Sequence, residues 1–432
     1  MDTPRVNHRA ILSVFGGFLS LFCTLGFLNA FGVFQQHYKA SILQNMTESD
    51  VSWIGTVAIF LIFLFAPITG ILVDRFGPRW LLIGGSIGTL LSVFLTSLCT
   101  QYCQFFLAQG GLQGISMAFV TWPPTAVVSR SLPTHRGLAL GTVVGGSSVG
   151  GVIWPIMLAR LLDQSTLGFG WVMRIVGFMM LPLFVIVCFT VREPRQQQSA
   201  PPPKPPSPAE TGSESELGAQ GPLGVQPITE KKKVEKSDVV TFLKNPVFIC
   251  LTTGLAIGNL GIFIPFFFIS SYAIEMGVDP QMSFYLISIL NAGSLFGRVG
   301  PGYLADRVGH YNICLLAVIS SGITAFCLTE ARSLAGLVVI SVAYGFISGA
   351  ILAIQNACVA KIAGIHMQGT AMGMFMGFLA VTTLVGGPIG GALLSRYGYL
   401  SLSTFTGAAL VGGSLLVSAA KLLLNRNIFA AV

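Results

Sequence analysis

The chain has 432 residues, of which 53% are hydrophobic and only 9% are charged, and its mean hydropathy is +0.76. Soluble domains carry about 25% charged residues, so this composition excludes an ordinary soluble protein and favours a polytopic membrane protein. The formal charge of +8 does not predict a nucleic-acid partner, because the basic residues lie in short loops between apolar runs, where they report membrane topology.

Apolar segments follow one another along the whole chain, and each is long enough to cross about 30 Å of hydrocarbon. The first is too long for the core of a signal peptide, so we expect it to be retained. The segments fall into two groups of six, which predicts an all-α fold of two six-helix bundles, residues 1–191 and 246–432. The twelve predicted spans are residues 10–35, 51–73, 80–99, 104–129, 137–160, 170–191, 246–273, 281–304, 312–329, 333–360, 368–394 and 400–424.

The segment between the two groups, residues 192–245, differs sharply in composition. It contains the stretch "PPPKPPSP" at 201–208 and the charged stretch "EKKKVEK" at 230–236. Such a segment has too few apolar residues to bury a core, which predicts a disordered linker.

The distribution of lysine and arginine predicts the orientation. With both termini inside, 18 basic residues lie on the inner side and 5 on the outer side, and Arg298 is the remaining one of the 24. Because basic residues concentrate in cytoplasmic loops, we expect both termini and the linker to be cytosolic. The expected location is the plasma membrane.

Two stretches repeat each other at matched places in the two halves. "GILVDRFGPR" at 70–79 and "GYLADRVGHY" at 302–311 share the pattern G-x-L-x-D-R-x-G, 232 positions apart. Glycine permits close helix approach or a tight turn, aspartate accepts hydrogen bonds from a helix N-terminus or pairs with arginine, and exposed arginine anchors a loop at the inner surface. The pattern predicts a gating latch made of Gly70, Asp74, Arg75, Gly77, Arg79, Gly302, Asp306, Arg307 and Gly309.

Six plus six spans, a central loop and this duplicated motif resemble the major facilitator superfamily over essentially the whole chain. Within it, "NAFGVFQQHY" at 29–38 and "RGLALGTVVGGSSVGG" at 136–151 resemble the fungal monocarboxylate-porter-like branch. The resemblance implies two bundles that rock about a midplane site, with the first, fourth, seventh and tenth spans lining the cavity.

Three departures from that branch bear on the mechanism. The acidic-Gly-Gly-aromatic signature is missing, since residues 7–10 read "NHRA". Val33 stands where the branch often has a lysine, and Ser294 stands where it often has an aspartate. The proton-coupled lactate mechanism is therefore not carried over. If protons are coupled, we expect them to travel on the substrate or through Asp74 or Asp306.

One cation lies inside a predicted span. Arg298 is about 12 Å from Asp306 along a helix that rises 1.5 Å per residue, and a charge at this depth costs at least about 2.5–3.5 kcal/mol. Its counterpart in the first half is Ala66, so the latch does not require it. Two interpretations stay open: Arg298 binds an anionic substrate group, or it hydrogen-bonds helix carbonyls or extends to the membrane surface.

Polar amides and aromatic residues inside the spans complete the candidate binding site. Each amide either contacts substrate or bridges two helices, and each aromatic ring either lines the cavity or packs against lipid or core. The candidates are Asn29, Asn259, Asn291, Gln355, Asn356, Trp122, Trp154, Phe266, Phe267 and Tyr344.

These features predict a secondary transporter that moves a small or medium organic anion across the bilayer by alternating access. The sequence has no phosphate-binding G-x-x-x-x-G-K-[ST] loop and no catalytic constellation, so we expect neither an enzyme nor a cofactor or metal. Two alternatives remain: an efflux transporter of a fungal secondary metabolite, and a non-transporting nutrient sensor on the same fold.

Overall fold

The computed structural model describes residues 8–163, 168–193 and 236–427 and is helical almost throughout. In this part of the chain, the first half contains α1 (His8–Leu21), α2 (Phe31–His37), α3 (Glu48–Leu64), α4 (Ala66–Phe76), α5 (Arg79–Thr96), α6 (Tyr102–Phe105), α7 (Gln113–Ser131), α8 (Arg136–Asp163) and α9 (Phe169–Thr190). The second half contains α10 (Lys236–Leu243), α11 (Pro246–Ile262), α12 (Ile264–Glu275), α13 (Pro280–Val308), α14 (His310–Phe326), α15 (Leu334–Ile362), α16 (Gln368–Tyr397) and α17 (Tyr399–Leu424).

Several of these helices join end to end. π-helical turns at Phe22–Gly26 and Phe106–Leu112 continue α1 toward α2 and α6 into α7, while α3 meets α4 and α11 meets α12 across one residue. Within the described ranges, ten segments are long and apolar enough to cross a membrane. Two further helical segments are equally long but more polar: the stretch formed by α6 and α7, and α13. Together with these two, the helical segments number the predicted twelve.

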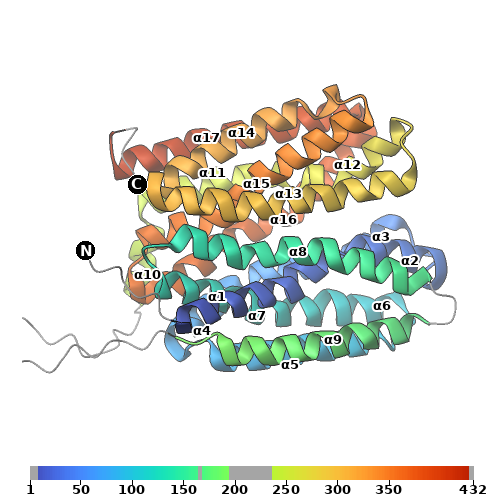
Figure 1. Ribbon diagram of the computed structural model, residues 1–432, viewed down its shortest axis with the longest axis horizontal. Coiled ribbons are helices and arrows are strands. Elements are labelled where there is room, and N and C mark those ends of the chain that lie inside the picture. Colours follow the sequence, from blue (N-terminus) through green and yellow to red (C-terminus); the bar gives the residue numbers. More distant parts are fainter. Residues whose placement is uncertain (1–7, 164–167, 194–235, 428–432) are drawn as a thin grey trace, which may run out of the picture.

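Figure 1 shows the two halves stacked as separate layers, with α1 to α9 below and α11 to α17 above. The start of α1, the end of α17 and α10 lie at the left end, which we call the inner end after the predicted orientation. Between the halves, α8 packs against α13, and α16 packs against α3 and α4.

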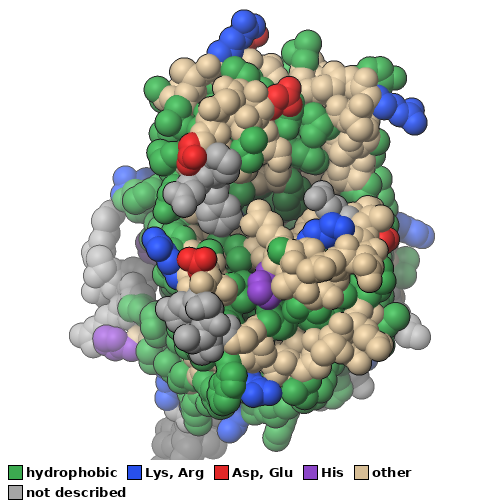
Figure 2. Space-filling view, turned by 90° about the vertical axis from the view of Figure 1, so that its right-hand side faces the viewer, with side chains coloured by type: hydrophobic (Ala, Val, Ile, Leu, Met, Phe, Trp, Pro, Cys, Tyr) green, Lys and Arg blue, Asp and Glu red, His purple; other side chains and the backbone are tan. Residues whose placement is uncertain are grey.

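The opposite, outer end is hollowed. Figure 2 looks onto this end and shows a recess with hydrophobic walls between the upper and the lower half. The molecule is therefore closed at the inner end, where the two halves touch, and open at the outer end.

The structure differs from the prediction of a disordered linker at residues 236–245. Here α10 forms, with Asp238 in its first turn, and Phe242 is buried against Phe248 of α11 with ring centroids 4.5 Å apart. Apolar residues 239, 240, 242 and 243 give this stretch a face to bury, which the proline-rich stretch before it lacks. Residues 194–235 of the predicted linker lie outside the described part of the chain.

Candidate functional site

Arg298 of α13 is packed against α8 of the other half, and only 4% of its surface is exposed. Its Nη1 donates to the backbone oxygen of Val144 at 2.7 Å and to the hydroxyl of Ser147. Its Nε is buried without a hydrogen-bond partner, and no carboxylate among the described residues forms an ion pair with it. The guanidinium thus ties the two halves together and keeps an unused donor.

Gly141 of α8 makes this close approach possible. A Cβ at Gly141 would overlap the backbone oxygen of Arg298. Because the α8 backbone comes so near to α13, the arginine reaches a helix carbonyl that a larger residue at position 141 would push away.

Asn29 and Asn291 come from different halves and approach each other across Gly151 of α8. A Cβ at Gly151 would lie 2.9 Å from both Asn29 Nδ2 and Asn291 Oδ1. Asn29 Nδ2 donates to the backbone oxygen of Ser147 at 3.4 Å, and Asn291 Oδ1 is buried without a hydrogen-bond partner in the described part of the chain. Ser147 therefore links the Asn29 amide, through its backbone oxygen, to the guanidinium of Arg298, through its hydroxyl. We call the five residues Asn29, Ser147, Gly151, Asn291 and Arg298 the central polar cluster.

Three aromatic residues hold backbone carbonyls where spans are broken or irregular. Trp154 Nε1 donates to the oxygen of Phe22 in the first π-helical turn at 2.9 Å, and Tyr344 Oη donates to the oxygen of Ile262 at the end of α11 at 2.9 Å. Trp122 Nε1 donates to the oxygen of Ile62 near the end of α3 at 2.8 Å. In a membrane such carbonyls need a partner inside the protein.

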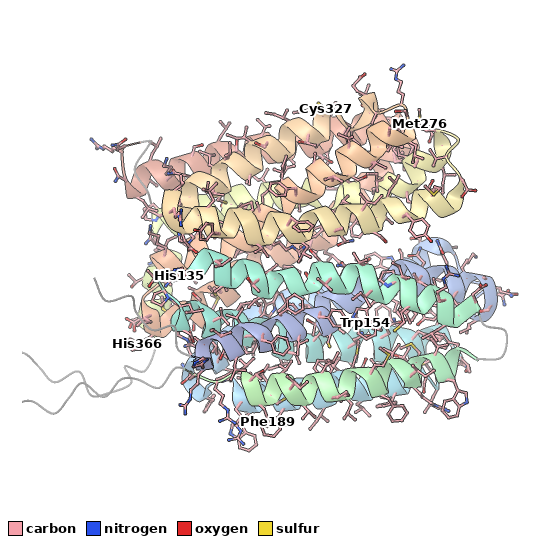
Figure 3. The ribbon with its side chains drawn as sticks, in the orientation of Figure 1. His135, Trp154, Phe189, Met276, Cys327 and His366 are labelled. Carbon is pink, nitrogen blue, oxygen red and sulfur yellow. The ribbon has the colours of Figure 1, made fainter. Side chains whose placement is uncertain are left out.

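The aromatic residues predicted to line the cavity differ in how far they are buried. Trp154 and Tyr344 are each 1% exposed, and Trp154 points from α8 into the lower half in Figure 3. Phe266 is partly buried beside Tyr344, with ring centroids 6.3 Å apart, whereas Phe267 is exposed.

Among the described residues, no hydrogen bond joins the remaining predicted amides to the central polar cluster. Asn259 of α11 donates to the hydroxyls of Thr382 and Thr383 of α16 at 3.1 and 2.8 Å, and so bridges two helices of the second half. Gln355 and Asn356 are buried on α15, and Asn356 Oδ1 has no partner among the described residues.

At the inner end, Asp74 of α4 joins the two halves. Its carboxylate accepts from the backbone N–H of Gly369 at 3.1 Å, from the N–H of Thr370 at 2.6 Å and from the Thr370 hydroxyl at 2.8 Å, all at the start of α16. Arg130 Nη1 of α7 donates to the same carboxylate at 2.9 Å. A helix N-terminus and an arginine both favour a negative charge, so this buried carboxylate is fully satisfied. We call these contacts the first inner latch.

Asp306 of α13, in the second half, makes the matching contacts with a helix of the first half. It accepts from the N–H groups of Gly137 and Leu138, at the start of α8, at 2.7 and 2.9 Å. His310 Nε2 lies 3.1 Å from the same carboxylate. These contacts form the second inner latch, whose ionisable partner is a histidine instead of an arginine.

The two latches repeat in the same register. Asp306, Gly302 and Gly369 each lie 232 positions after their counterparts Asp74, Gly70 and Gly137. A Cβ at Gly70 would overlap the oxygen of Gly369, and a Cβ at Gly302 would lie 2.5 Å from the oxygen of Gly137. Figure 3 places His135 and His366, just before α8 and α16, at this same end. The glycines let each pair of helices meet closely enough for the aspartate to reach.

The other motif residues form the turns and surface of the inner end. Gly77 and Gly309 take positive φ angles of 78° and 106°, which only glycine adopts readily. Arg75 and Arg79 are exposed, while the Arg307 guanidinium lies 4.5 Å from the centre of the Tyr303 ring and donates to its hydroxyl.

Sequence reasoning did not identify several partners in these sites. The predicted latch and binding site did not include Arg130, Ser147, Thr370 or His310. The 232-residue offset could have pointed to Gly137 and Gly369 as a repeated pair, since both precede glycine-rich spans.

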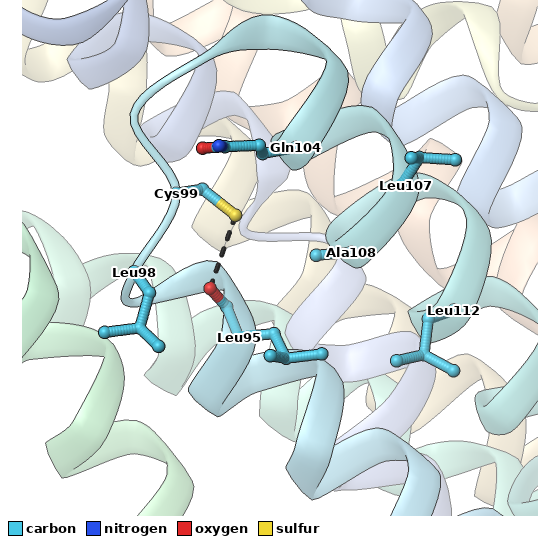
Figure 4. A pocket seen from close by; sticks show the side chains of 7 residues that line it. All are labelled: Leu95, Leu98, Cys99, Gln104, Leu107, Ala108 and Leu112. Atoms are coloured by element: carbon cyan, nitrogen blue, oxygen red, sulfur yellow. Dashed lines mark hydrogen bonds between the residues drawn. The ribbon is translucent and has the colours of Figure 1, made fainter.

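A further groove lies on the outer surface of the first half, away from these residues. It has a volume of about 400 Å³ and is lined by apolar side chains near the ends of α5 and α6, as Figure 4 shows. Cys99 Sγ at its rim bonds the Leu95 oxygen at 3.3 Å, and the cysteine is free.

Comparison with known proteins gives consistent matches. A family model described as Major Facilitator Superfamily matches residues 12–381 and again 302–428. An MFS-type transporter of Aspergillus fumigatus is 54% identical over 98% of this chain and 94% of its own length. The agnestins efflux protein AgnL12 of Paecilomyces divaricatus is 42% identical, covering 97% and 89%, and the aspyridones efflux protein apdF of Emericella nidulans is 37% identical, covering 97% and 79%.

Among solved structures, the human organic anion transporter MFSD10 is similar in fold. Its TM-score is 0.68 over 96% of this chain and 100% of that protein, at 15% sequence identity. The names of these relatives do not single out the monocarboxylate-porter-like branch that two stretches of the sequence resemble.

Proposed function

Because the chain belongs to the major facilitator superfamily and is a membrane transporter of that type, we propose that it exports a small organic metabolite by alternating access. The support for export is the similarity to two proteins named as efflux proteins, at 42% and 37% identity over nearly the whole chain. The plasma membrane, with cytosolic termini, is the proposed location.

The proposed substrate carries an acidic group that binds Arg298. The supporting observation is a guanidinium buried at the contact between the halves, on the same helix as Asn291; neither its Nε nor Asn291 Oδ1 has a hydrogen-bond partner among the described residues. An anion supplies acceptors for the guanidinium, and a hydroxyl on the same molecule supplies a donor for Asn291. A charged hydrogen bond contributes about 1.5–3 kcal/mol, so a substrate acid can compete with the Val144 carbonyl.

This competition gives a physical route from binding to movement. In the conformation closed at the inner end, Arg298 donates to α8 across the contact between the halves. For export, an anion from the cytosol binds the guanidinium in the state that is open at the inner end, and the two inner latches form as that end closes. At the open outer end, Val144 and Ser147 then take over the guanidinium, and the anion is released.

The test is flux of labelled organic acids through proteoliposomes containing the purified protein, measured with and without a pH gradient. Binding of the substrate by Arg298 predicts transport that depends on this residue, and we expect Arg298→Gln to reduce it at least about tenfold while Arg298→Lys retains part of it. Phe296→Leu, at a position of the same helix that is 68% exposed, serves as the control for a substitution on α13. Anion flux unchanged in Arg298→Gln would contradict the binding role, and ligand binding without flux would favour a sensor.

A further inference from the structure

A second groove lies on the lipid-facing side of the first half, near the inner end. It has a volume of about 570 Å³, and its walls include Leu72 and Phe76 of α4, Trp80 of α5 and Phe119 of α7. Phe76 and Trp80 are 69% and 73% exposed. The groove has an open floor because a Cβ at Gly84 would meet no atom within 4 Å.

Two exposed arginines adjoin the wall residues of this groove in the sequence. Arg75 and Arg79 are exposed and immediately precede the two aromatic wall residues Phe76 and Trp80. Glu193 lies nearby, 3.8 Å from the position of a Cβ on Gly77, but it also faces Arg130 at 3.8 Å. Each exposed arginine is thus one residue away in the chain from an aromatic wall of the groove.

The internal repeat shows that the open surface at Gly84, the aromatic wall at Trp80 and the arginine at position 79 occur in the first half and not at the matching positions of the second. At the matching positions 232 residues later, Leu316 replaces Gly84, Asn312 replaces Trp80 and Tyr311 replaces Arg79. Leu316 is 61% exposed, so a side chain fills the surface that Gly84 leaves open. The counterpart of Arg75 is Arg307, which is engaged by Tyr303.

We propose that this groove binds an anionic phospholipid of the inner leaflet. One acyl chain lies along Gly84 between the aromatic walls, and the phosphate lies at Arg75 and Arg79. Guanidinium groups bind phosphate strongly, and inner-leaflet anionic lipids attract basic residues at the membrane surface. This site is independent of the substrate and of the transport direction.

The position of the groove gives the lipid a structural consequence. Leu72 and Phe76 line the groove, while Gly70 and Asp74 of the same helix contact α16 in the first inner latch. Successive residues on a helix are about 100° apart, so these pairs lie on opposite faces of α4. A bound lipid thus packs against the face of α4 opposite the first inner latch and favours the state that is closed at the inner end.

Trp80 provides a direct probe, because bromine atoms on a lipid chain quench tryptophan fluorescence on contact. The full-length protein is placed in phosphatidylcholine vesicles that contain equal small amounts of brominated phosphatidylserine or brominated phosphatidylcholine. We expect stronger quenching by the brominated serine lipid, and we expect Trp80→Phe to remove that excess.

Two variants and one control decide the location. Gly84→Leu introduces the residue that the second half already carries, and Arg79→Gln lowers the preference for the serine lipid about fivefold, equivalent to about 1 kcal/mol. Gly412→Leu on α17, where a Cβ also meets no atom within 4 Å, should keep the full excess. Equal quenching by both lipids, or an excess that survives Gly84→Leu and Arg79→Gln, would overturn the proposal and leave ordinary bilayer contact.

Discussion

Replacing Gly302 by alanine should open the inner end of the molecule. The added Cβ would lie 2.5 Å from the Gly137 oxygen, well inside ordinary van der Waals contact, so α13 and α8 must separate. Separation lengthens the 2.7 and 2.9 Å bonds that Asp306 accepts from Gly137 and Leu138. Loss of one hydrogen bond to a charged group costs about 1.5–3 kcal/mol, which shifts the population toward the inner-open state between about tenfold and a hundredfold.

Gly300 supplies the matched control on the same helix. A Cβ there meets no atom within 4 Å, and alanine improves helix propensity equally at both positions, by about 1 kcal/mol. Spin labels on cysteines at the exposed positions 79 and 366, in a background without native exposed cysteines, report the distance between the halves at the inner end. A distance distribution for Gly302→Ala that matches that for Gly300→Ala would refute the reasoning.

Three further outcomes are expected. Arg130→Gln leaves the buried Asp74 carboxylate without its cation and should cost about 3–5 kcal/mol, seen as a lower unfolding temperature that Asp74→Asn partly restores; no restoration would argue against the pair. His310→Ala removes the imidazole that lies 3.1 Å from the Asp306 carboxylate, so the spin-label distance should shift toward the open state; an unchanged distance would contradict a contribution of His310 to the second inner latch. Trp154→Phe removes an indole donor and should lower stability by about 1–3 kcal/mol, measured by thermal unfolding; an unchanged transition would contradict it.

The fold was largely predictable because a membrane imposes a simple length rule. Most spans are visible in the sequence as apolar runs, and the repeated motif at 70–79 and 302–311 marks equivalent places in the two halves. Even so, hydropathy describes α13 poorly, since Asn291 and Arg298 lower its apolar character. That loss is itself informative, because helices that carry such residues face the interior.

The candidate site was less predictable, for a different reason. Its strongest contacts run from side chains to backbone, as from Arg298 to Val144 and from Asp74 to Gly369, and a backbone group has no residue type to recognise. The partners are also more than 150 positions apart in the chain. Identifying Arg298 needed only its chemistry, whereas finding what it touches needed the three-dimensional arrangement.

The shared register of the two contacts between the halves has a mechanical consequence. A Cβ at Gly141 would overlap the oxygen of Arg298, and a Cβ at Gly373 would overlap the oxygen of Ala66, so the two hinges have matching geometry. Only one hinge, however, contains a charged side chain. The repeat thus gives the two contacts the same backbone geometry, and if Arg298 binds the substrate as proposed, only the α8–α13 contact responds to it directly. We expect the conformational change to begin at the α8–α13 contact and the α4–α16 contact to separate afterwards.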